Sequence, residues 1–441
     1  MTIAATMYRA ITFSMLSRYA VYAAKIASLM VLARIFSPDQ FGLVASTAVF
    51  SVFFQALADF GLAPAVINLK CLSKPDRDGL FSLTLLLGLV FGLSFLAASA
   101  PIISFYKQPS LRLVIPFVAV SLIFYSASIM PTALMLRDQR FSQIAIVGVL
   151  AEIGSALCAI GLAQVWHPLL ALASKTLVQA VLNFIGLLAF SAKTEFGRPS
   201  PGVKLSAIRP LASFSAYQLG FNIVNYFSRN LDNMLVGRYM GPTALGAYNE
   251  AYQIMRYPLM LLTFAMTPAI QPVIARHAHD VVTVRTVHDD FAQKLSLLGA
   301  VVAFVLFVMS EKIVMLVLGP QWQATVPVVR ILAIAIPAQV VLSTSGSFFQ
   351  ALGRTDMLFK SGLLSALVLV PAIALGVHQG LAALCWYLVG AFYINFVQAY
   401  YLLYKHVLNF GFDLFLIKMV PMFLVVLAMT LIAWNGSSWL L

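Results

Sequence analysis

The sequence predicts an all-α, polytopic membrane protein of about 12–14 transmembrane helices, in two six-helix lobes related by a parallel internal repeat. The first observation is composition: of 441 residues, 61% are hydrophobic and 10% are charged, and the mean hydropathy is +0.93. The second is that runs of about 20 apolar residues, enough to cross a hydrocarbon core, follow one another along almost the whole chain. The third is a repeat of Arg, Pro and Gly positions after 204 residues, the difference between Arg34 and Arg238.

The apolar runs define the expected spans, which are 11–36, 41–67, 79–105, 113–136, 143–165, 168–191, 211–240, 243–275, 291–318, 323–351, 357–377, 380–404 and 414–434. The first run is too long for the apolar region of a signal peptide and contains Arg18 and Lys25. We therefore interpret it as a permanent helix.

The longest connection, 192–210, contains Gly-Arg-Pro-Ser-Pro-Gly at 197–202 and separates two halves. It divides the chain into an N-terminal lobe (1–191), a cytoplasmic linker (192–210), a C-terminal lobe (211–404) and an additional C-terminal membrane segment (405–441).

Basic residues concentrate on alternate connections, which the positive-inside rule assigns to the cytoplasm. These are Arg9, Lys70, Lys74, Arg77, Arg137, Arg140, Lys193, Arg198, Lys204, Arg209, Arg276, Arg285, Lys294, Arg354, Lys360, Lys405 and Lys418. The other connections hold Arg34, Lys107, Arg112, Arg238 and Lys312. The bias predicts a cytoplasmic N-terminus.

Several functional classes are excluded by what the chain lacks. No polar stretch approaches the roughly 100 residues of a soluble catalytic domain. No Gly-Lys pair is present, so a P-loop is absent. The three cysteines, Cys71, Cys158 and Cys385, form no Cys-x-x-Cys pair, and His277, His279 and His288 are expected in a solvated basic connection. We predict no catalytic residue, metal site or cofactor, and attribute the net charge of +13 to topology rather than nucleic-acid binding.

The internal repeat is ungapped across two spans. It aligns Met30 with Met234, Arg34 with Arg238, Pro38 with Pro242, Gly42 with Gly246, Phe60 with Phe264 and Pro64 with Pro268. About six spans separate the copies, so both begin on the same side, and such halves typically rock around a shared central site. A weaker echo pairs Leu136-Arg137-Asp138 with Gly353-Arg354-Thr355-Asp356, at an offset of 217.

Ionisable side chains inside the expected spans are costly against lipid, so they must face one another or water. They are Arg18, Lys25, Lys175, Arg229, Arg256, Arg330, Asp59, Glu152, Asp232 and Glu250. Helical spacing groups several on polar faces. These faces are Arg18-Tyr22-Lys25, Lys175-Gln179-Asn183, Asn222-Asn225-Arg229-Asp232 and Asn249-Gln253-Arg256, with Tyr257 beside the last. Lys25 and Arg229 are also 204 residues apart, which places a cation at equivalent positions in both halves.

Leu32-Ala-Arg-Ile-Phe-Ser-Pro-Asp-Gln-Phe-Gly-Leu-Val-Ala45, with Ala58-Asp-Phe-Gly-Leu62, resembles the first helix pair of Wzx-type oligosaccharide flippases. So do Asn225-Tyr-Phe-Ser-Arg-Asn-Leu-Asp232, Gly237-Arg-Tyr-Met-Gly-Pro242 and Leu245-Gly-Ala-Tyr248. Those flippases are the polysaccharide-transporter branch of the MATE-like MOP superfamily. The resemblance implies two lobes around a central cavity, alternating access and an undecaprenyl-pyrophosphate-linked oligosaccharide cargo. Membrane lipids, a polysaccharide polymerase and chain-length machinery are the implied partners.

A pyrophosphate inside a bilayer needs opposite charge, and Arg binds phosphate in a bidentate manner. The pyrophosphate-binding candidates are Lys25, Arg229, Arg256 and Arg18. The sugar-binding candidates are Asn222, Asn225, Gln253, Tyr22 and Tyr257. Asp59, Glu152, Asp232 and Glu250 are the candidates for ion coupling, although a buried carboxyl also pairs structurally or stays protonated.

Two other functions remain open. One is a MATE-like multidrug or organic-cation antiporter, which should present an acidic or aromatic cavity, whereas bases outnumber acids inside these spans. The other is a membrane enzyme acting on lipid-linked sugars, which would need acid-base or nucleophilic groups on a substantial outer loop.

Overall fold

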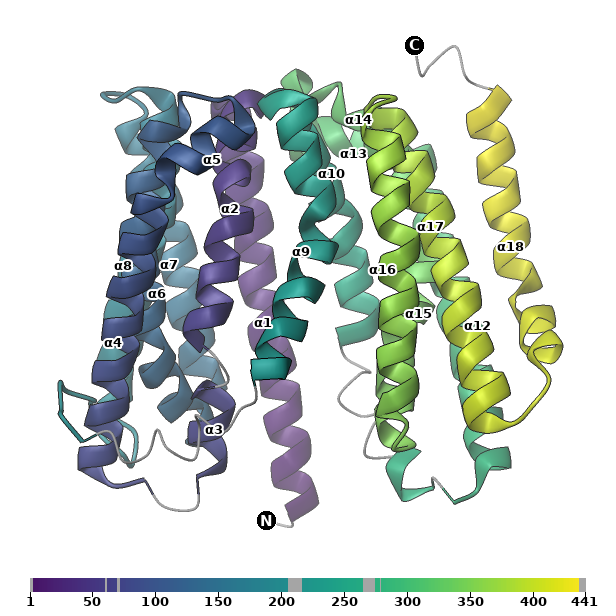
Figure 1. Cartoon of the computed structure of the whole chain (residues 1–441), viewed down its shortest axis with the longest axis horizontal. Coiled ribbons are helices and arrows are strands. Elements are labelled where there is room, and N and C mark those ends of the chain that lie inside the picture. The colour runs from purple at the N-terminus through teal and green to yellow at the C-terminus, as the bar shows by residue number, and fades with distance from the viewer. Residues whose placement is uncertain are drawn as a thin grey trace. The chain divides into compact units, whose positions relative to one another are not determined.

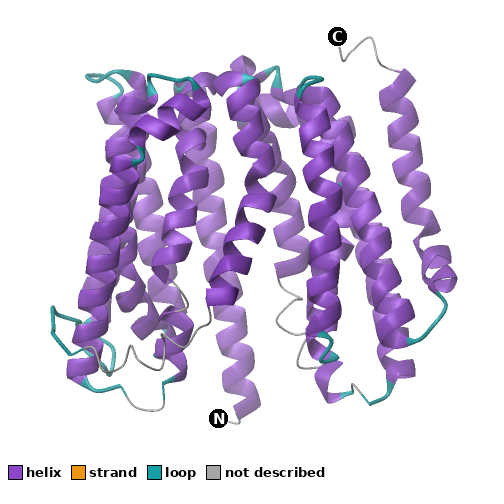
Figure 2. Ribbon diagram, in the orientation of Figure 1, coloured by secondary structure: helices purple, strands orange, loops and turns teal. Residues whose placement is uncertain are grey.

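The computed structural model contains helices joined by short loops, with no strand among the residues it describes (Figures 1 and 2). Those residues are 3–59, 62–69, 72–204, 216–264, 274–277 and 279–435. Within the helices, the side chains of 3–18, 64, 65, 68, 216–225, 228, 229 and 264 lie outside the description.

The first half of the chain forms eight helices up to the long connection. They are α1 (Ile3–Ile35), α2 (Pro38–Asp59), α3 (Leu62–Asn68), α4 (Lys74–Ala97), α5 (Ser99–Tyr106), α6 (Leu111–Arg137), α7 (Phe141–Leu162) and α8 (Pro168–Ser191).

The second half repeats this order with more breaks. It comprises α9 (Ala216–Tyr239), α10 (Gly241–Phe264), α12 (Val281–Val308), α13 (Ser310–Val317), the 3-10 turn η2 (Pro320–Trp322), α14 (Thr325–Ala333), α15 (Ile336–Ala351), α16 (Thr355–Val377), α17 (Leu381–Leu402), the π-helical turn η3 (Leu403–Leu408) and α18 (Phe412–Asn435).

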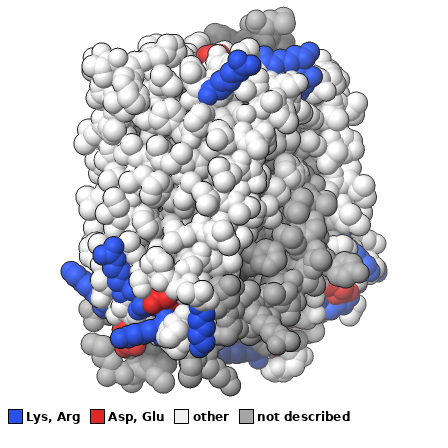
Figure 3. Space-filling view, turned by 60° about the vertical axis from the view of Figure 1, so that its left-hand side comes forward, with Lys and Arg blue, Asp and Glu red and all other residues white. Residues whose placement is uncertain are grey.

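Within the described residues, nine helices are long and apolar enough to cross a membrane. The pair α14 and α15, bent by 58°, passes the same test together and is either a broken span or a re-entrant loop. On the face shown in Figure 3, charged side chains gather at the two ends and leave an uncharged band between them. A charge-free band flanked by charged ends is the pattern expected of a lipid-facing surface. The chain is therefore a multi-pass, all-α membrane protein, and the predicted fold class is confirmed.

The helices form two compact units, Met1–Phe227 with Gly241–Gly246, and Ser228–Met240 with Ala247–Leu441. In the first unit α6 packs against α2, α4 and α8, while α7 packs against α8 and α1. Gly88 and Gly92 of α4 permit close contact with α6, because a Cβ at Gly92 would lie 2.8 Å from the carbonyl oxygen of Ala119.

The second unit is built around α12, which packs against α14, α15 and α18, and around α17, which packs against α14, α15 and α16. Its core contains a stack of aromatic rings from three helices. Phe396 and Tyr400 of α17 lie against Phe415 of α18, and Phe348 of α15 is fully buried nearby. Stacked and edge-to-face rings of this kind hold α18 to the rest of the unit.

The two units share local geometry at the connection after α6 and after α15. Gln139 and Gly353 both adopt positive φ, +53° and +69°, and the next residue is an arginine in each case. Arg140 N donates to Met135 O (2.9 Å), and Arg354 N donates to Phe349 O (2.8 Å), which is the same helix-ending motif. The equivalent arginines are thus 214 residues apart (354 minus 140), and this geometry replaces the expected offset of 217.

Each of these arginines also donates a hydrogen bond from the loop that holds it to the segment at the far end of the following helix pair. Arg140 donates to the carbonyl oxygen of Lys193 after α8 (2.5 Å), and Arg354 donates to that of His406 after α17 (2.8 Å). The carbonyls are 213 residues apart, so the repeat extends through α8 in the first half and α17 in the second.

The repeated Pro and Gly positions meet in a reciprocal helix crossing, in which all the residues belong to the first unit. A Cβ at Gly42 of α2 would lie 1.7 Å from the Pro242 carbonyl oxygen, and one at Gly246 of α10 would lie 2.0 Å from that of Pro38. Only glycine allows two backbones to approach so closely. The repeated Pro and Gly positions of the two copies are therefore in direct contact with each other.

Candidate functional site

A buried ion pair joins two neighbouring helices of the first unit. Glu152 of α7 is 3% exposed, and its Oε1 lies 2.8 Å from Nζ of Lys175 on α8. Its Oε2 accepts a hydrogen bond from Gln179 Nε2 at 2.7 Å. Lys175 and Gln179 are four residues apart on one helix face, so they bind both oxygens of the same carboxylate.

Helix α1 adds a second cation to this cluster. Lys25 is exposed and acts electrostatically on Glu152, and the buried Ser28, one turn further along the helix, faces the same carboxylate. Tyr125 of α6 interacts with the same carboxylate. The structure therefore brings the predicted residues Lys25 and Glu152 together with Lys175, and we define Glu152, Lys175, Gln179 and Lys25 as the α7–α8 cluster.

The acidic residues predicted in the second half are buried and hydrogen-bonded. Asp232 of α9 accepts from the hydroxyl of Tyr248 on α10 (2.7 Å) and from the backbone N of Asn233 (2.8 Å). Glu250 of α10 accepts from the side chain of Asn249 (3.0 Å). The partner of Asp232 on another helix makes this carboxylate a link between α9 and α10.

The other predicted site residues are more accessible. Arg256 is exposed on α10, while Gln253 and Tyr257 on the same helix and Tyr22 on α1 are half-buried. Asp59, at the end of α2, accepts a hydrogen bond from the backbone N of Ala63 (3.3 Å) across the break before α3. The side chains of Arg18, Asn222, Asn225 and Arg229 lie outside the described residues.

A second charged cluster lies at the start of α12 and was not predicted. The expected span began at 291, but α12 begins at Val281, and His288 is fully buried. The expectation of a solvated loop there is wrong for His288. Its Nδ1 lies 2.8 Å from the Tyr404 hydroxyl, which donates to Asp289.

Asp289 is the centre of this second cluster. Its Oδ2 lies 3.0 Å from Nζ of Lys418 on α18 and 3.6 Å from Nε of Arg285. Arg285 lies one turn away on α12, whereas Tyr404 comes from the π-helical turn η3 and Lys418 from α18, both more than 100 residues away along the chain. No local pattern could have revealed them, although a His-Asp pair one turn from Arg285 was a visible signal.

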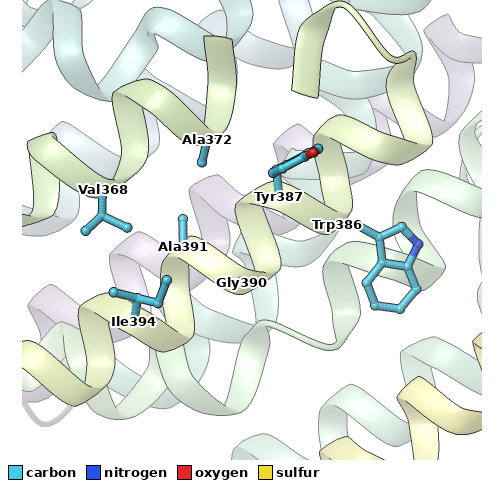
Figure 4. Close-up of a pocket in the computed structure, with 7 residues that line it drawn as sticks. All are labelled: Val368, Ala372, Trp386, Tyr387, Gly390, Ala391 and Ile394. Carbon is cyan, nitrogen blue, oxygen red and sulfur yellow. The ribbon is translucent and has the colours of Figure 1, made fainter. Parts of the chain in front are cut away.

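An apolar hollow of about 360 Å³ lies on α16 and α17 (Figure 4). Its lining residues are Val368, Ala372, Trp386, Tyr387, Gly390, Ala391 and Ile394. These residues carry no formal charge, so the hollow differs in chemistry from the α7–α8 cluster. Among the described residues, no group of three or more His, Cys, Asp and Glu side chains is placed to hold a metal ion.

Residues 31–327 match a family model described as "Polysaccharide biosynthesis protein". The chain is similar to the lipopolysaccharide biosynthesis protein WzxC of Escherichia coli (strain K12), with 26% identity over 90% of this chain and 81% of that protein. It is similar to the teichuronic acid biosynthesis protein TuaB of Bacillus subtilis (strain 168), with 25% identity over 88% and 80% of the two chains. The succinoglycan biosynthesis transport protein ExoT of Rhizobium meliloti (strain 1021) is 23% identical over 87% and 77%.

Among solved structures, the fold is similar to that of the lipid II flippase MurJ in an inward closed conformation. The TM-score is 0.72, with 12% identity, over 96% of this chain and 99% of that one. An inward-facing multidrug resistance MATE family transporter of the MOP superfamily gives a TM-score of 0.62, with 14% identity, over 93% and 95%. The resemblance to Wzx-type proteins seen in the sequence is confirmed, and the chain belongs to the polysaccharide biosynthesis protein family, with the fold of MOP-superfamily transporters.

Proposed function

We propose that this protein is a flippase that moves undecaprenyl-pyrophosphate-linked oligosaccharide units from the cytoplasmic to the outer leaflet of a bacterial inner membrane, for surface polysaccharide synthesis. The family match over residues 31–327 carries this proposal. Three relatives that align along most of the chain are named for lipopolysaccharide, teichuronic acid and succinoglycan biosynthesis. The fold shared with a lipid II flippase agrees with a lipid-linked cargo.

The chemistry of the cargo explains why this chain carries cations inside its spans. A diphosphate taken from water into a medium of low dielectric constant needs opposite charge and hydrogen-bond donors. We assign this role to Lys25, Arg229, Arg256 and Arg18. In support, Lys25 is exposed and acts on the same carboxylate as Lys175, and Arg256 is exposed on α10.

Polar residues near these cations have the donors and acceptors that sugars require. We assign sugar contacts to Asn222, Asn225, Gln253, Tyr22 and Tyr257, and ion coupling to Asp59, Glu152, Asp232 and Glu250. The hydrogen-bonded settings of Glu152 and Asp232 give each a defined partner to exchange during a transport cycle.

Alternating access by two lobes is the proposed mechanism. The proposed lobes are residues 1–191 and 211–404, with 192–210 as the cytoplasmic linker and 405–441 as an added segment. The N-terminus is assigned to the cytoplasm on the distribution of basic residues. A polysaccharide polymerase and chain-length machinery would receive the product at the outer face.

An organic-cation antiporter is the competing transport function, because MATE transporters share the fold. The charge inside the spans favours an anion. A cation carrier binds its cargo with uncompensated carboxylates, whereas Glu152 is already paired with Lys175 and hydrogen-bonded to Gln179. A membrane enzyme acting on lipid-linked sugars would instead show glycosyl transfer by the purified protein.

The proposal is tested by replacing Lys25 with Ala and Arg229 with Gln and by measuring polymer export at matched protein levels. Loss of a phosphate-binding cation should reduce export at least about tenfold, since a charged hydrogen bond contributes about 1.5–3 kcal/mol. Lys294, an exposed lysine paired with Asp290, provides the control Lys294→Gln, which should export normally. Normal export by both site variants would contradict these assignments.

A further inference from the structure

The Glu152–Lys175 ion pair of the α7–α8 hairpin is absent from the equivalent hairpin of the second half, so this fold does not require it. The offsets of 214 and 213 residues defined by the repeated arginines and carbonyls equate Glu152 with Ala366 and Lys175 with Leu388. Helices α16 and α17 pack against each other, as α7 and α8 do, without an ion pair at these positions. Buried ion pairs seldom stabilise a fold more than apolar residues of similar volume. A role other than stability therefore accounts for the pair.

The two partners differ in their access to the surroundings. The side chain of Lys175 keeps 20% of its exposure, whereas that of Glu152 keeps 4%. The lysine is therefore the more accessible partner of the pair. The neighbouring Lys25 is exposed, so an anion that contacts Lys175 also meets a second cation.

The charge balance of the cluster changes when an anion binds. Lys25, Lys175 and Glu152 leave one net positive charge in the empty state. A diphosphate group with two negative charges would reverse that sign, unless the carboxylate were neutralised. With a proton on Glu152, the two lysines balance the two phosphate charges, and a neutral assembly has the lowest cost in a medium of low dielectric constant.

We propose that Lys175 is a further diphosphate-binding residue and that Glu152 is its resident counter-ion, which takes up one proton from water when the diphosphate draws Lys175 away. This inference rests on the proposed function, because it takes a prenyl diphosphate as the ligand. The ammonium of Lys175 moves its N–H donor from Glu152 Oε1 to a phosphate oxygen, and no covalent bond changes except the new O–H bond on Glu152. Gln179 keeps its hydrogen bond to Oε2.

The groups that face Glu152 are consistent with this exchange. They come from three helices, with Lys25 and Ser28 on α1, Tyr125 on α6, and Lys175 and Gln179 on α8. Once Lys175 turns away, the neutral partners Ser28, Tyr125 and Gln179 cannot compensate a buried carboxylate, and Lys25 is occupied by the same anion. Protonation then removes the remaining negative charge.

Binding of farnesyl diphosphate to the purified full chain tests the exchange, with farnesol as the uncharged comparison, at a pH below the last ionisation of the terminal phosphate, where the ligand carries two negative charges like the cargo. Calorimetry in two buffers of different ionisation enthalpy measures the protons taken up. The wild type should take up about one proton more per ligand than Glu152→Gln, and the comparison of the two cancels the ligand's own ionisation. The wild-type affinity should also fall more steeply with rising pH than that of E152Q, since one more proton is bound.

The contribution of Lys175 is measured in the Glu152→Gln background, because removing Lys175 from the wild type would leave the Glu152 carboxylate buried and unpaired. The double variant E152Q/K175Q should bind farnesyl diphosphate about tenfold more weakly than E152Q, and K294Q should bind as the wild type does. Equal affinity of E152Q and E152Q/K175Q, or equal proton uptake by wild type and E152Q, would overturn this inference alone. Wild-type protein that does not distinguish farnesyl diphosphate from farnesol would overturn the proposed function with it.

Discussion

The carboxylates of this chain show how single residues are tolerated inside apolar helices. Glu152, Asp232 and Asp289 are all buried, and each accepts a hydrogen bond from a side chain on another helix. The partners lie 23, 16 and 129 residues away in the chain. The sequence therefore reveals which charges are unusual but not what satisfies them, because pairing across helices depends on packing that helical periodicity does not specify.

Asp289 gives a test of this point with a matched neighbour. Asp289→Asn removes the negative charge that balances Lys418 and Arg285, so we expect a loss of stability of about 3 kcal/mol. Asp290→Asn changes the adjacent residue, whose pair with Lys294 is exposed, and it should have no measurable effect. Thermal unfolding of the purified proteins measures both, and D289N melting at the same temperature as D290N would refute the role of Asp289.

At the scale of elements, the apolar runs predicted where the spans lie but not how they break. The expected span 79–105 is divided into α4 and α5, and 323–351 is divided into α14 and α15 with a 58° bend. The expected span 291–318 starts ten residues late, because His288 and Asp289 look like loop residues until Tyr404 and Lys418 are placed beside them. Hydropathy indicates which segments avoid water, whereas the helix breaks and the start of α12 depend on contacts with other helices.

At the crossing of α2 and α10, the Pro and Gly positions that repeat in the sequence are the residues that make the contact. Gly42→Ala and Gly246→Ala each place a Cβ within 2.0 Å of a proline carbonyl oxygen, so we expect both to lower the melting temperature and the yield of folded protein. Gly362→Ala is the control, since a Cβ there meets nothing within 4 Å, and helix propensity should make it neutral or stabilising by up to about 1 kcal/mol. The close-contact interpretation fails if G42A is as stable as G362A.

At the scale of the whole molecule, the repeat predicts a shared topology, and the chemistry then differs between halves. The motif after α6 recurs after α15, but the ion pair of α7 and α8 has Ala366 and Leu388 as its counterparts. The fold was therefore predictable from composition and repeat. The candidate site was predictable only as a set of charged faces, because Lys175 and Glu152 stood on separate helices with no signal of their contact.

We expect the crossing of α2 and α10 to change during alternating access, because α2 belongs to the proposed N-terminal lobe and α10 to the proposed C-terminal lobe. Asp39 and Thr243 carry side-chain oxygens 3.3 Å apart at this crossing, and cysteines at both positions can be cross-linked. In a background without native cysteines, we expect the D39C/T243C disulfide to arrest polymer export and reduction to restore it. Each single-cysteine variant serves as the control, and full export by the cross-linked protein would exclude separation of these helix ends.

Reconstitution of the purified chain in liposomes with a fluorescent undecaprenyl-diphosphate oligosaccharide in the membrane tests the central claim most directly. We predict translocation between leaflets by the wild type, with at least about a tenfold lower rate for Arg229→Gln and Lys25→Gln. Translocation of a cationic dye, with no movement of the lipid-linked sugar by the same preparation, would contradict the account.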